Sequence, residues 1–360
     1  MARFHPLTVT GVRHTIRDAV ELTLAPPPEA AREFAFTPGQ YLTFRKELEG
    51  VELRRCYSIC AGLDDGVIRV GIKKVADGAF SSWANTELKP GDVLEAMPPA
   101  GRFGFMPEPG AGRHYLAFAG GSGITPILSI IRSVLAREPA AQVTLVYANK
   151  AVNTIMFREE LEDLKNRYLD RFSVVHVLET DAQEIELFTG MLTAEKLKGL
   201  FRYWIEPRDA DRVLICGPAP MMEVVESALL AHGVEKEKIR IERFRSDQPG
   251  RLPLRQRKNG EMAGKTCTAR ITLDGATRTV TVPMDGTPVL QAALDAQMDA
   301  PHSCRAGICS TCMARLTAGE VEMIANNALE DYEVERGYIL TCQSLPLSEE
   351  IELTYDHGGE

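Results

Sequence analysis

The sequence predicts a multidomain α/β protein with three parts: an antiparallel β-barrel, a domain built on a parallel β-sheet, and a small α+β domain. Three observations lead to this expectation. Short strands broken by Gly and Pro fill the N-terminal part, apolar runs then alternate with helical segments, and a hairpin precedes a cysteine cluster near the C-terminus. At about 150 residues per domain, a chain of 360 residues has room for two to three domains.

The composition excludes several classes of protein. The chain is 44% hydrophobic and 25% charged, as is usual for a globular protein, and its net charge of -9 argues against nucleic-acid binding. Residues 115–131 carry no charge, but a glycine turn interrupts them and they are too short to span a membrane. The N-terminus lacks the apolar core of a signal peptide. We therefore expect a cytoplasmic protein with no nucleic-acid partner and no membrane association.

Residues 1–105 are expected to form the barrel. Strand-like runs occur at 20–24, 40–44, 67–73 and 93–97, with turn dipeptides such as Pro38-Gly39 and Pro90-Gly91 between them. Residues 106–245 have a different rhythm. Apolar runs at 115–119, 143–147, 172–178 and 212–216 are separated by helical segments, which indicates a parallel sheet covered on both faces.

The remaining residues are expected to form a linker and a third domain. Residues 246–264 contain Pro, Gly and basic residues without apolar periodicity, which is typical of an exposed linker. Residues 265–360 begin with a hairpin, because apolar and polar residues alternate over 267–273 and Asp274-Gly275 makes a turn. A short helix is expected to follow, with Thr287 as its N-cap and Pro288 as its first residue.

The strongest chemical signal is the pattern Cys304-x4-Cys309-x2-Cys312, with Cys342 further along the chain. Four thiolates at this spacing can hold a cluster of two irons and two sulfides. A structural zinc ion is the alternative, although zinc ribbons usually carry two CxxC pairs. From about residue 265 the chain resembles a plant-type ferredoxin domain. This resemblance implies a β-grasp fold and a 2Fe-2S cluster on these four cysteines.

A second group of residues suggests a flavin site in the barrel. Arg55 can pair with a phosphate, Tyr57 can stack on a flat ring and Ser58 can hydrogen-bond to its edge, although a plain strand would carry the same residues. The turn at Gly78 and Ser81 can offer amides to a pyrophosphate. Together these segments resemble the flavin-binding barrel of the ferredoxin-NADP reductase family, which implies that all five residues contact the flavin.

A third group suggests a nucleotide site. Gly120, Gly121 and Gly123 lie with Thr125 between an apolar strand and a helix, where free amides can cradle a phosphate; a plain tight turn is the alternative. This segment resembles the nicotinamide domain of the same reductase family. The resemblance extends to two later segments. It implies that Cys216 lies beside the nicotinamide, with Gly217-Pro218 forming the turn that follows it. It also implies that the ring of Phe244 packs against the flavin.

The choice of nucleotide is read from the end of the second strand of this domain. An acidic residue there would bind the 2′-hydroxyl of NADH, whereas this strand ends in Asn149 and Lys150. Lys150, with Arg158 as a weaker second, can hold the 2′-phosphate of NADPH. A solvated surface lysine is the alternative. We therefore expect NADPH.

The three groups form one electron path, from NADPH through the flavin to the cluster, in which Ser58 and Cys216 are expected to orient the reacting rings. Segments 4–9, 52–60, 242–244 and 342–347 resemble the reductase subunits of phenylacetyl-CoA epoxidases. That resemblance implies FAD, NADPH and a di-iron oxygenase partner in phenylacetate catabolism. No Glu-x-x-His pattern occurs in the chain, so oxygen activation is expected on that partner.

Other functions are open at this stage. The chain can be the reductase of another aromatic oxygenase or hydroxylase, including one that uses NADH or FMN. It can also be a ferredoxin-type carrier or redox sensor without enzymatic activity, or a zinc-stapled binding protein. The acidic run after residue 319 is either a solvated face or a docking face for an electron acceptor.

Overall fold

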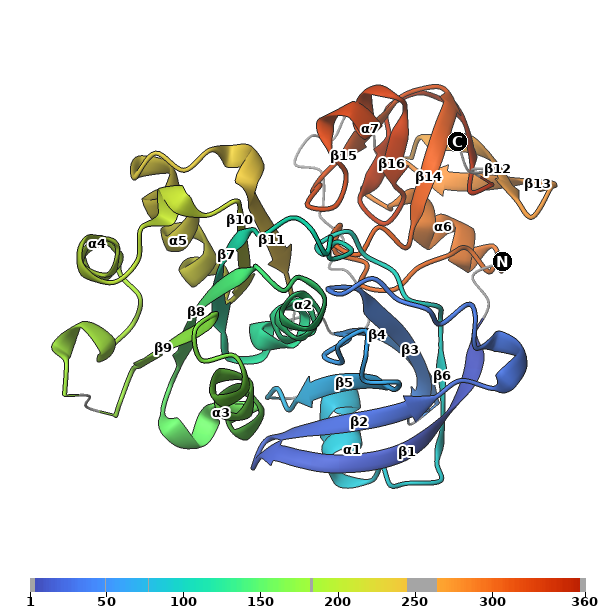
Figure 1. The fold of residues 1–360 in the computed structure, drawn as a ribbon. Coiled ribbons are helices and arrows are strands. Elements are labelled where there is room, and N and C mark those ends of the chain that lie inside the picture. The colour runs from blue at the N-terminus through green and yellow to red at the C-terminus, as the bar shows by residue number, and fades with distance from the viewer. Residues whose placement is uncertain (1–3, 49, 77, 182–183, 245–263, 357–360) are drawn as a thin grey trace. The chain divides into compact units, whose positions relative to one another are not determined.

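The computed structural model describes residues 4–48, 50–76, 78–181, 184–244 and 264–356 (Figure 1). These residues fall into two compact units. The first takes the described residues of 4–52 and 57–244, and the second takes those after 263 together with residues 53–56. Apart from Gly264, the expected linker at 246–264 lies outside the described residues.

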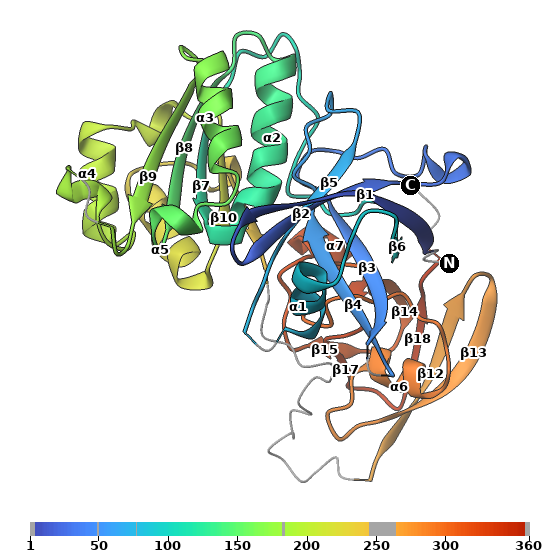
Figure 2. The same ribbon diagram turned by 90° about the horizontal axis from the view of Figure 1, so that it is seen from below.

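The antiparallel barrel expected at the N-terminus is present (Figure 2). Its strands are β1 (His5–Ile16), β2 (Ala19–Ala25), β3 (Tyr41–Leu48), β4 (Val51–Ser58), β5 (Ile68–Lys73) and β6 (Val93–Ala96), and helix α1 (Ala79–Thr86) follows β5. The strand order is β4-β3-β6-β1-β2-β5. An antiparallel bridge from Ile59, just after β4, to Val70 of β5 joins the two edges. Strand β1 was not among the expected strands; it alternates between buried and exposed residues over 5–10 and loses this alternation further along.

A five-stranded parallel sheet follows, as expected from the alternating pattern. Its strands are β7 (His114–Gly120), β8 (Gln142–Asn149), β9 (Phe172–Leu178), β10 (Arg212–Gly217) and β11 (Ile239–Arg243), in the order β11-β10-β7-β8-β9. Helices α2 (Ile124–Arg137) and α3 (Arg158–Arg167) pack into one buried core, and α4 (Ala194–Tyr203) and α5 (Ala219–Ala231) into another. The order reverses direction between β7 and β10. The carboxyl ends of these two strands therefore form the switch point at which such sheets bind ligands.

The second unit has the β-grasp arrangement implied by the ferredoxin resemblance. Its elements are β12 (Thr266–Leu273), β13 (Ala276–Pro283), α6 (Val289–Asp295), β14 (Met313–Ala318), β15 (Val321–Met323), α7 (Asp331–Glu335), β16 (Tyr338–Leu340), β17 (Ser344–Pro346) and β18 (Glu350–Thr354). The main sheet has the order β13-β12-β18-β14-β16, with β12 and β18 parallel. One expectation is wrong in detail. Pro288 occupies the N-cap position of α6 without a side-chain capping bond, whereas the hydroxyl of Thr287 donates to Asp285 at 2.7 Å.

Short 3₁₀ helices lie in the connections: η1 (Pro28–Ala30), η2 (Gly121–Gly123), η3 (Val152–Thr154), η4 (Glu186–Phe188), η5 (Pro207–Asp209) and η6 (Lys236–Lys238). The uncharged stretch at 115–131 folds as expected, because β7, η2 and α2 divide it into strand, turn and helix. Within the described ranges, every helix is too short or too polar to cross a membrane.

Candidate functional site

The glycine turn after β7 packs directly against the turn after β10. A Cβ on Gly120 would lie 2.6 Å from Cδ of Pro218, and one on Gly123 would lie 2.1 Å from the carbonyl oxygen of Cys216. Glycine is therefore required for the two strand ends to meet. The structure thus brings together the residues of both turns that the sequence singled out: Gly120, Gly121, Gly123, Cys216, Gly217 and Pro218.

The turn leads into α2 without a side-chain cap, so backbone amides at the start of this helix are available to an anion. Thr125 stands in this first turn but is buried, and its hydroxyl donates to the carbonyl oxygen of Ser122 at 3.0 Å. This hydroxyl therefore fixes the turn from within.

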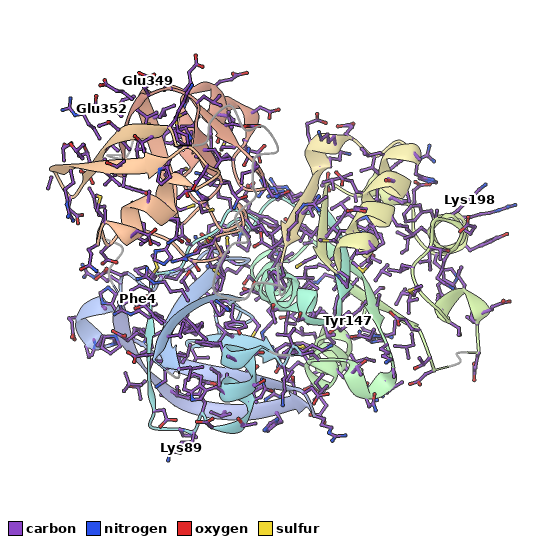
Figure 3. All side chains as sticks on the ribbon, turned by 180° about the vertical axis from the view of Figure 1, so that it is seen from behind. Phe4, Lys89, Tyr147, Lys198, Glu349 and Glu352 are labelled. Atoms are coloured by element: carbon purple, nitrogen blue, oxygen red, sulfur yellow. The ribbon has the colours of Figure 1, made fainter. Side chains whose placement is uncertain are left out.

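Tyr147 of β8 supports the same turn and was not anticipated from the sequence (labelled in Figure 3). The side chain is fully buried, and burial raises the pKa of its phenol above the ordinary value. Its hydroxyl donates to the carbonyl oxygen of Gly121 at 2.9 Å and lies 3.5 Å from that of Met156, which precedes α3. One buried hydroxyl thus links the turn to the loop that leads into α3.

Strand β5 of the barrel presents one face to the parallel-sheet part of the same unit. Arg69 lies 3.5 Å from Glu160 of α3, and a Cβ on Gly71 would lie 2.8 Å from Cγ2 of Thr125. Lys73 is the third residue on this face, since side chains alternate along a strand. The face therefore reaches from α3 across the start of α2 to the glycine turn.

Lys73 brings a positive charge to that turn. Its Nζ lies 3.6 Å from the position that a Cβ of Gly121 would take. The side chain is half-buried and makes no ion pair with any residue that the structure describes, although Asp18 exerts some attraction. Burial lowers the pKa of its ammonium group. The sequence carried only a weak signal for this role: Lys73 ends a strand and lies on the same face of that strand as Gly71.

Lys150, the residue expected to select NADPH, is exposed directly after β8. Its carbonyl oxygen accepts from the backbone N–H of Thr180 at 2.9 Å, so the backbone is held while the side chain faces solvent. Arg158 is a poorer candidate than Lys150, because its Nε pairs with Glu162 on the same helix at 2.8 Å.

Cys216 and Glu242 are neighbours across β10 and β11. Cys216 is fully buried, and burial together with the nearby carboxyl of Glu242 raises the pKa of its thiol. Burial also raises the pKa of Glu242, to about 8. Phe244, two residues later, is 39% exposed, so its ring has a free surface. The carboxyl of Glu242 was not singled out from the sequence, because only the pairing of β10 with β11 places it beside Cys216.

The residues expected to hold a flavin lie on β4 and at the start of α1. Tyr57 packs against Phe44 and Phe80, with ring centroids 6.2 Å and 5.6 Å apart. Nη1 of Arg55 donates to the carbonyl oxygen of Arg54 at 2.8 Å, and Ser58 is buried. Along β4, Arg55 and Tyr57 share one face of the strand and Ser58 lies on the other.

The turn at Gly78 is built by Ser81. The Ser81 hydroxyl donates to the carbonyl oxygen of Gly78 at 3.1 Å and accepts from the N–H of Val75 at 3.2 Å. Gly78 precedes α1, which has no side-chain cap. Ser81 is buried, so it shapes the turn, while the amides at the start of α1 are left for an anion.

The four cysteines of the second unit approach each other as two pairs. The thiol of Cys309 hydrogen-bonds to that of Cys304 and, with burial, raises the pKa of Cys304, and Cys342 does the same to Cys312. Backbone amides also point at these sulfurs: the N–H of Cys304 donates to Sγ of Cys309 and that of Ala306 to Sγ of Cys304, both at 3.4 Å. In the part of the chain that the structure describes, no three His, Cys, Asp or Glu side chains converge on one ion. Four thiols with backbone amides directed at their sulfurs are the donor set that a 2Fe-2S cluster requires.

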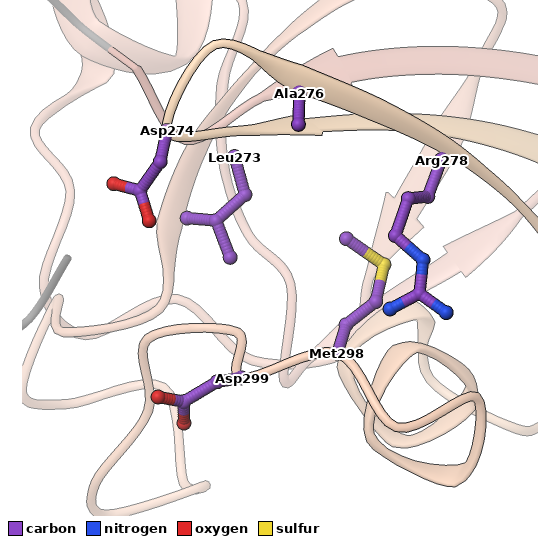
Figure 4. Close-up of a pocket in the computed structure, with 6 residues that line it drawn as sticks. All are labelled: Leu273, Asp274, Ala276, Arg278, Met298 and Asp299. Carbon is purple, nitrogen blue, oxygen red and sulfur yellow. The ribbon is translucent and has the colours of Figure 1, made fainter.

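The same unit has a shallow pocket of about 130 Å³ beside the hairpin (Figure 4). Nη1 and Nη2 of Arg278 in its wall donate to the carbonyl oxygens of Gln297 and Ala296 after α6, both at 3.3 Å. None of the residues predicted from the sequence to bind a cofactor or a metal lines it. Its lining is Leu273, Asp274, Ala276, Arg278, Met298 and Asp299.

Three protein-family models match the chain in succession. Residues 8–105 match the oxidoreductase FAD-binding domain and residues 118–227 the oxidoreductase NAD-binding domain. Residues 271–347 match the 2Fe-2S iron-sulfur cluster binding domain. The flavin, nicotinamide and iron-sulfur modules inferred from the motifs are therefore confirmed.

Two solved structures show the same fold. Phthalate dioxygenase reductase aligns with a TM-score of 0.58 and 23% identity, over 98% of each chain. An intact type IV self-sufficient cytochrome P450 monooxygenase aligns with a TM-score of 0.71 and 23% identity, over 97% of this chain and 41% of the other.

The chain is also similar in sequence to proteins of known function. The chain is 39% identical over 359 residues to one of the subunits of the 1,2-phenylacetyl-CoA epoxidase of Escherichia coli (strain K12), and the match covers 100% of this chain and 99% of the relative. It is 37% identical over 333 residues to the ferredoxin reductase component of the 3-ketosteroid-9-alpha-monooxygenase of Mycobacterium tuberculosis, covering 92% and 88%. The chain belongs to the family of FAD-, NAD- and 2Fe-2S-binding reductase components that supply electrons to oxygenases.

Proposed function

We propose that this protein takes electrons from NADPH and delivers them to a di-iron oxygenase that epoxidises phenylacetyl-CoA. The observation that carries this proposal is the 39% identity, over the whole chain, to a component of the Escherichia coli epoxidase. The absence of a Glu-x-x-His pattern from the chain agrees with a division of labour in which the di-iron centre lies on the partner.

The nucleotide is assigned to the switch point between β7 and β10. Amides at the start of α2 and the ammonium of Lys73 would hold the pyrophosphate, and Lys150 would hold the 2′-phosphate. Cys216 would lie beside the nicotinamide as a buried, protonated thiol, and Glu242 would be next to it on β11. The hydroxyls of Tyr147 and Thr125 act indirectly, by fixing the glycine turn.

The flavin is assigned to β4 and α1. The free amides of α1 and the guanidinium of Arg55 would hold its phosphates, and Tyr57 would stack on its ring. Ser58 would face the reactive edge of the ring, and Phe244 would cover the ring where the nicotinamide enters. Held by these residues, the flavin would supply both hydride chemistry toward the nucleotide and single-electron chemistry toward the cluster.

The cluster is assigned to Cys304, Cys309, Cys312 and Cys342. The domain limits that follow are 1–105 for the flavin domain, 106–245 for the nucleotide domain, 246–264 for the linker and 265–360 for the ferredoxin domain. Matches at 8–105, 118–227 and 271–347 support this division.

The protein is assigned to the cytoplasm. All eight cysteines are free thiols, and a reducing compartment would keep the four ligand thiols available for iron. Acidic side chains such as Glu349 and Glu352 project from the ferredoxin domain (Figure 3). They would favour an acceptor with a basic docking surface.

The test is NADPH consumption by the purified protein mixed with a purified phenylacetyl-CoA oxygenase component, with and without phenylacetyl-CoA. We expect consumption that depends on the substrate and yields one epoxide per NADPH. Parallel reactions with NADH measure the nucleotide preference, and a Lys150→Ala variant tests its source.

Two results would contradict parts of the proposal. NADPH oxidation with an artificial acceptor but without epoxide would retain the reductase and remove the phenylacetyl-CoA assignment. The 3-ketosteroid monooxygenase system would then be the next partner to test, since its reductase component is 37% identical to this chain. Equal rates with NADH, unchanged by Lys150→Ala, would remove the preference for NADPH.

A further inference from the structure

Gln343 is a buried neutral side chain directly after Cys342. Its Nε2 lies 3.0 Å from the carbonyl oxygen of Arg305, 3.0 Å from that of Cys342 and 3.7 Å from Sγ of Cys342. The amide has two hydrogens for three acceptors, so one hydrogen is shared. The side chain thereby joins the loop of the first three cysteines to the fourth cysteine.

The surrounding backbone holds this side chain in place. The N–H of Gln343 donates to the carbonyl oxygen of Leu340 at 2.8 Å, and its own carbonyl accepts from Ile324 at 2.9 Å. Gly307, in the ligand loop, has φ +72°, and a Cβ there would lie 2.9 Å from Cγ of Gln343. The loop therefore packs directly on the glutamine and holds its amide beside Cys342.

We infer that Gln343 is a positioning residue of the iron-sulfur centre, which sets the reduction potential of the cluster through a hydrogen bond from its amide to Sγ of Cys342. The inference rests on the proposed cluster ligands. It goes beyond them by naming a residue that is not a ligand but adjusts the reduction potential of the cluster. The backbone donors at Cys304 and Ala306 serve the sulfurs of the ligand loop, whereas Gln343 brings a side-chain donor to the fourth cysteine.

The direction of the effect follows from charge. Reduction by one electron adds negative charge to the cluster and to its thiolate sulfurs, and an N–H donor stabilises the more negative state. The donor therefore raises the reduction potential. A higher potential favours transfer of an electron from the flavin to the cluster.

The test compares the full-length protein with its Gln343→Met variant, which keeps the length of the side chain and removes both donors. The reduction potential is measured by titration with dithionite, followed by the EPR signal of the reduced cluster, so that neither nucleotide nor oxygenase is needed. We expect the equilibrium constant for reduction to fall about fivefold to tenfold, and tenfold corresponds to about 59 mV for one electron.

Gln291→Met is the matched control. Gln291 also contacts the ligand loop, since its Oε1 lies 3.4 Å from Nη1 of Arg305, but its own amide donates to Asp295 on the same helix. We expect the reduction potential of the cluster in Gln291→Met to match that in the unmodified protein. An unchanged potential in Gln343→Met, or an equal fall in both variants, would overturn the inference.

A second measurement covers the case in which Gln343→Met fails to assemble a cluster. Pulsed EPR of the unmodified protein, labelled with ¹⁵N on glutamine side chains alone, should detect a nitrogen coupled to the reduced cluster. The absence of that coupling would overturn the inference. A protein with no 2Fe-2S signal at all would instead refute the proposed function, and the inference with it.

Discussion

Replacing Lys73 with methionine removes one positive charge from the glycine turn and keeps the aliphatic stem. Lys73 is suited to this test because its Nζ lies 3.6 Å from the place of a Cβ on Gly121, and because no carboxylate among the described residues pairs with it. If the pyrophosphate of the nucleotide rests on this turn, the ammonium group lies within reach of it.

The size of the effect can be worked from this geometry. At about 5 Å and an effective dielectric constant of about 20, two unit charges attract by about 3 kcal/mol. Hydrogen bonds to charged groups contribute about 1.5–3 kcal/mol in measured series. Because each step of about 1.4 kcal/mol is tenfold, about 10- to 100-fold weaker binding of NADPH is expected in Lys73→Met.

The assay is calorimetric binding of NADP⁺ to the purified protein, together with KM and kcat for NADPH and an artificial acceptor. Lys74→Met is the control, because Lys74 is adjacent and exposed. Since burial lowers the pKa of Lys73, binding to the unmodified protein should weaken at a lower pH than the ordinary lysine value of 10.5, and the variant should lack this step. Equal losses in both variants, or no loss in Lys73→Met, would refute the reasoning.

Three further predictions concern the same site. Tyr147→Phe removes the hydroxyl that lies 2.9 Å from the carbonyl oxygen of Gly121, and should raise KM for NADPH about fivefold with kcat nearly unchanged; a lower kcat alone would contradict it. Gly123→Ala places a Cβ 2.1 Å from the carbonyl oxygen of Cys216, and should abolish NADP⁺ binding in calorimetry while flavin absorbance persists. Burial raises the pKa of Glu242 to about 8, so its contribution to stability is present below pH 4.5 and lost as the pH rises through about 8. Glu242→Gln should flatten this part of the melting-temperature profile, and an unchanged slope would count against the raised pKa.

The sequence was sufficient for features that depend on neighbours in the chain. The spacing of Cys304, Cys309 and Cys312 indicated a cluster loop, because the geometry of such a loop is set by a few consecutive residues. The alternation over 267–273 and the apolar runs at 115–119 and 143–147 predicted β12, β7 and β8, because burial on one or both faces leaves a local pattern. The order of the three modules followed from these patterns.

The sequence was less informative where a hydroxyl in a short motif can hydrogen-bond within its own turn. The hydroxyls of Ser81 and Thr125 are buried and bond to backbone groups three to six residues away, which leaves the backbone amides of these two turns as the groups that the prediction of cofactor contacts rests on. A hydroxyl beside a glycine turn has the same sequence signature whether it faces a ligand or the loop. Only the rotation of the side chain distinguishes the two.

Contacts between distant residues were decided by the tertiary structure alone. Lys73 reaches the turn at Gly121 because β5 lies against α2, and Glu242 lies beside Cys216 because β10 pairs with β11. Gln343 meets the loop at Arg305 for the same kind of reason. Spacing along the chain carries no information about such pairs, since their distance is fixed by how sheets and helices pack. The sequence thus determined which modules and cofactors this protein has. The packing of its strands determined which further side chains lie beside the candidate cofactor sites.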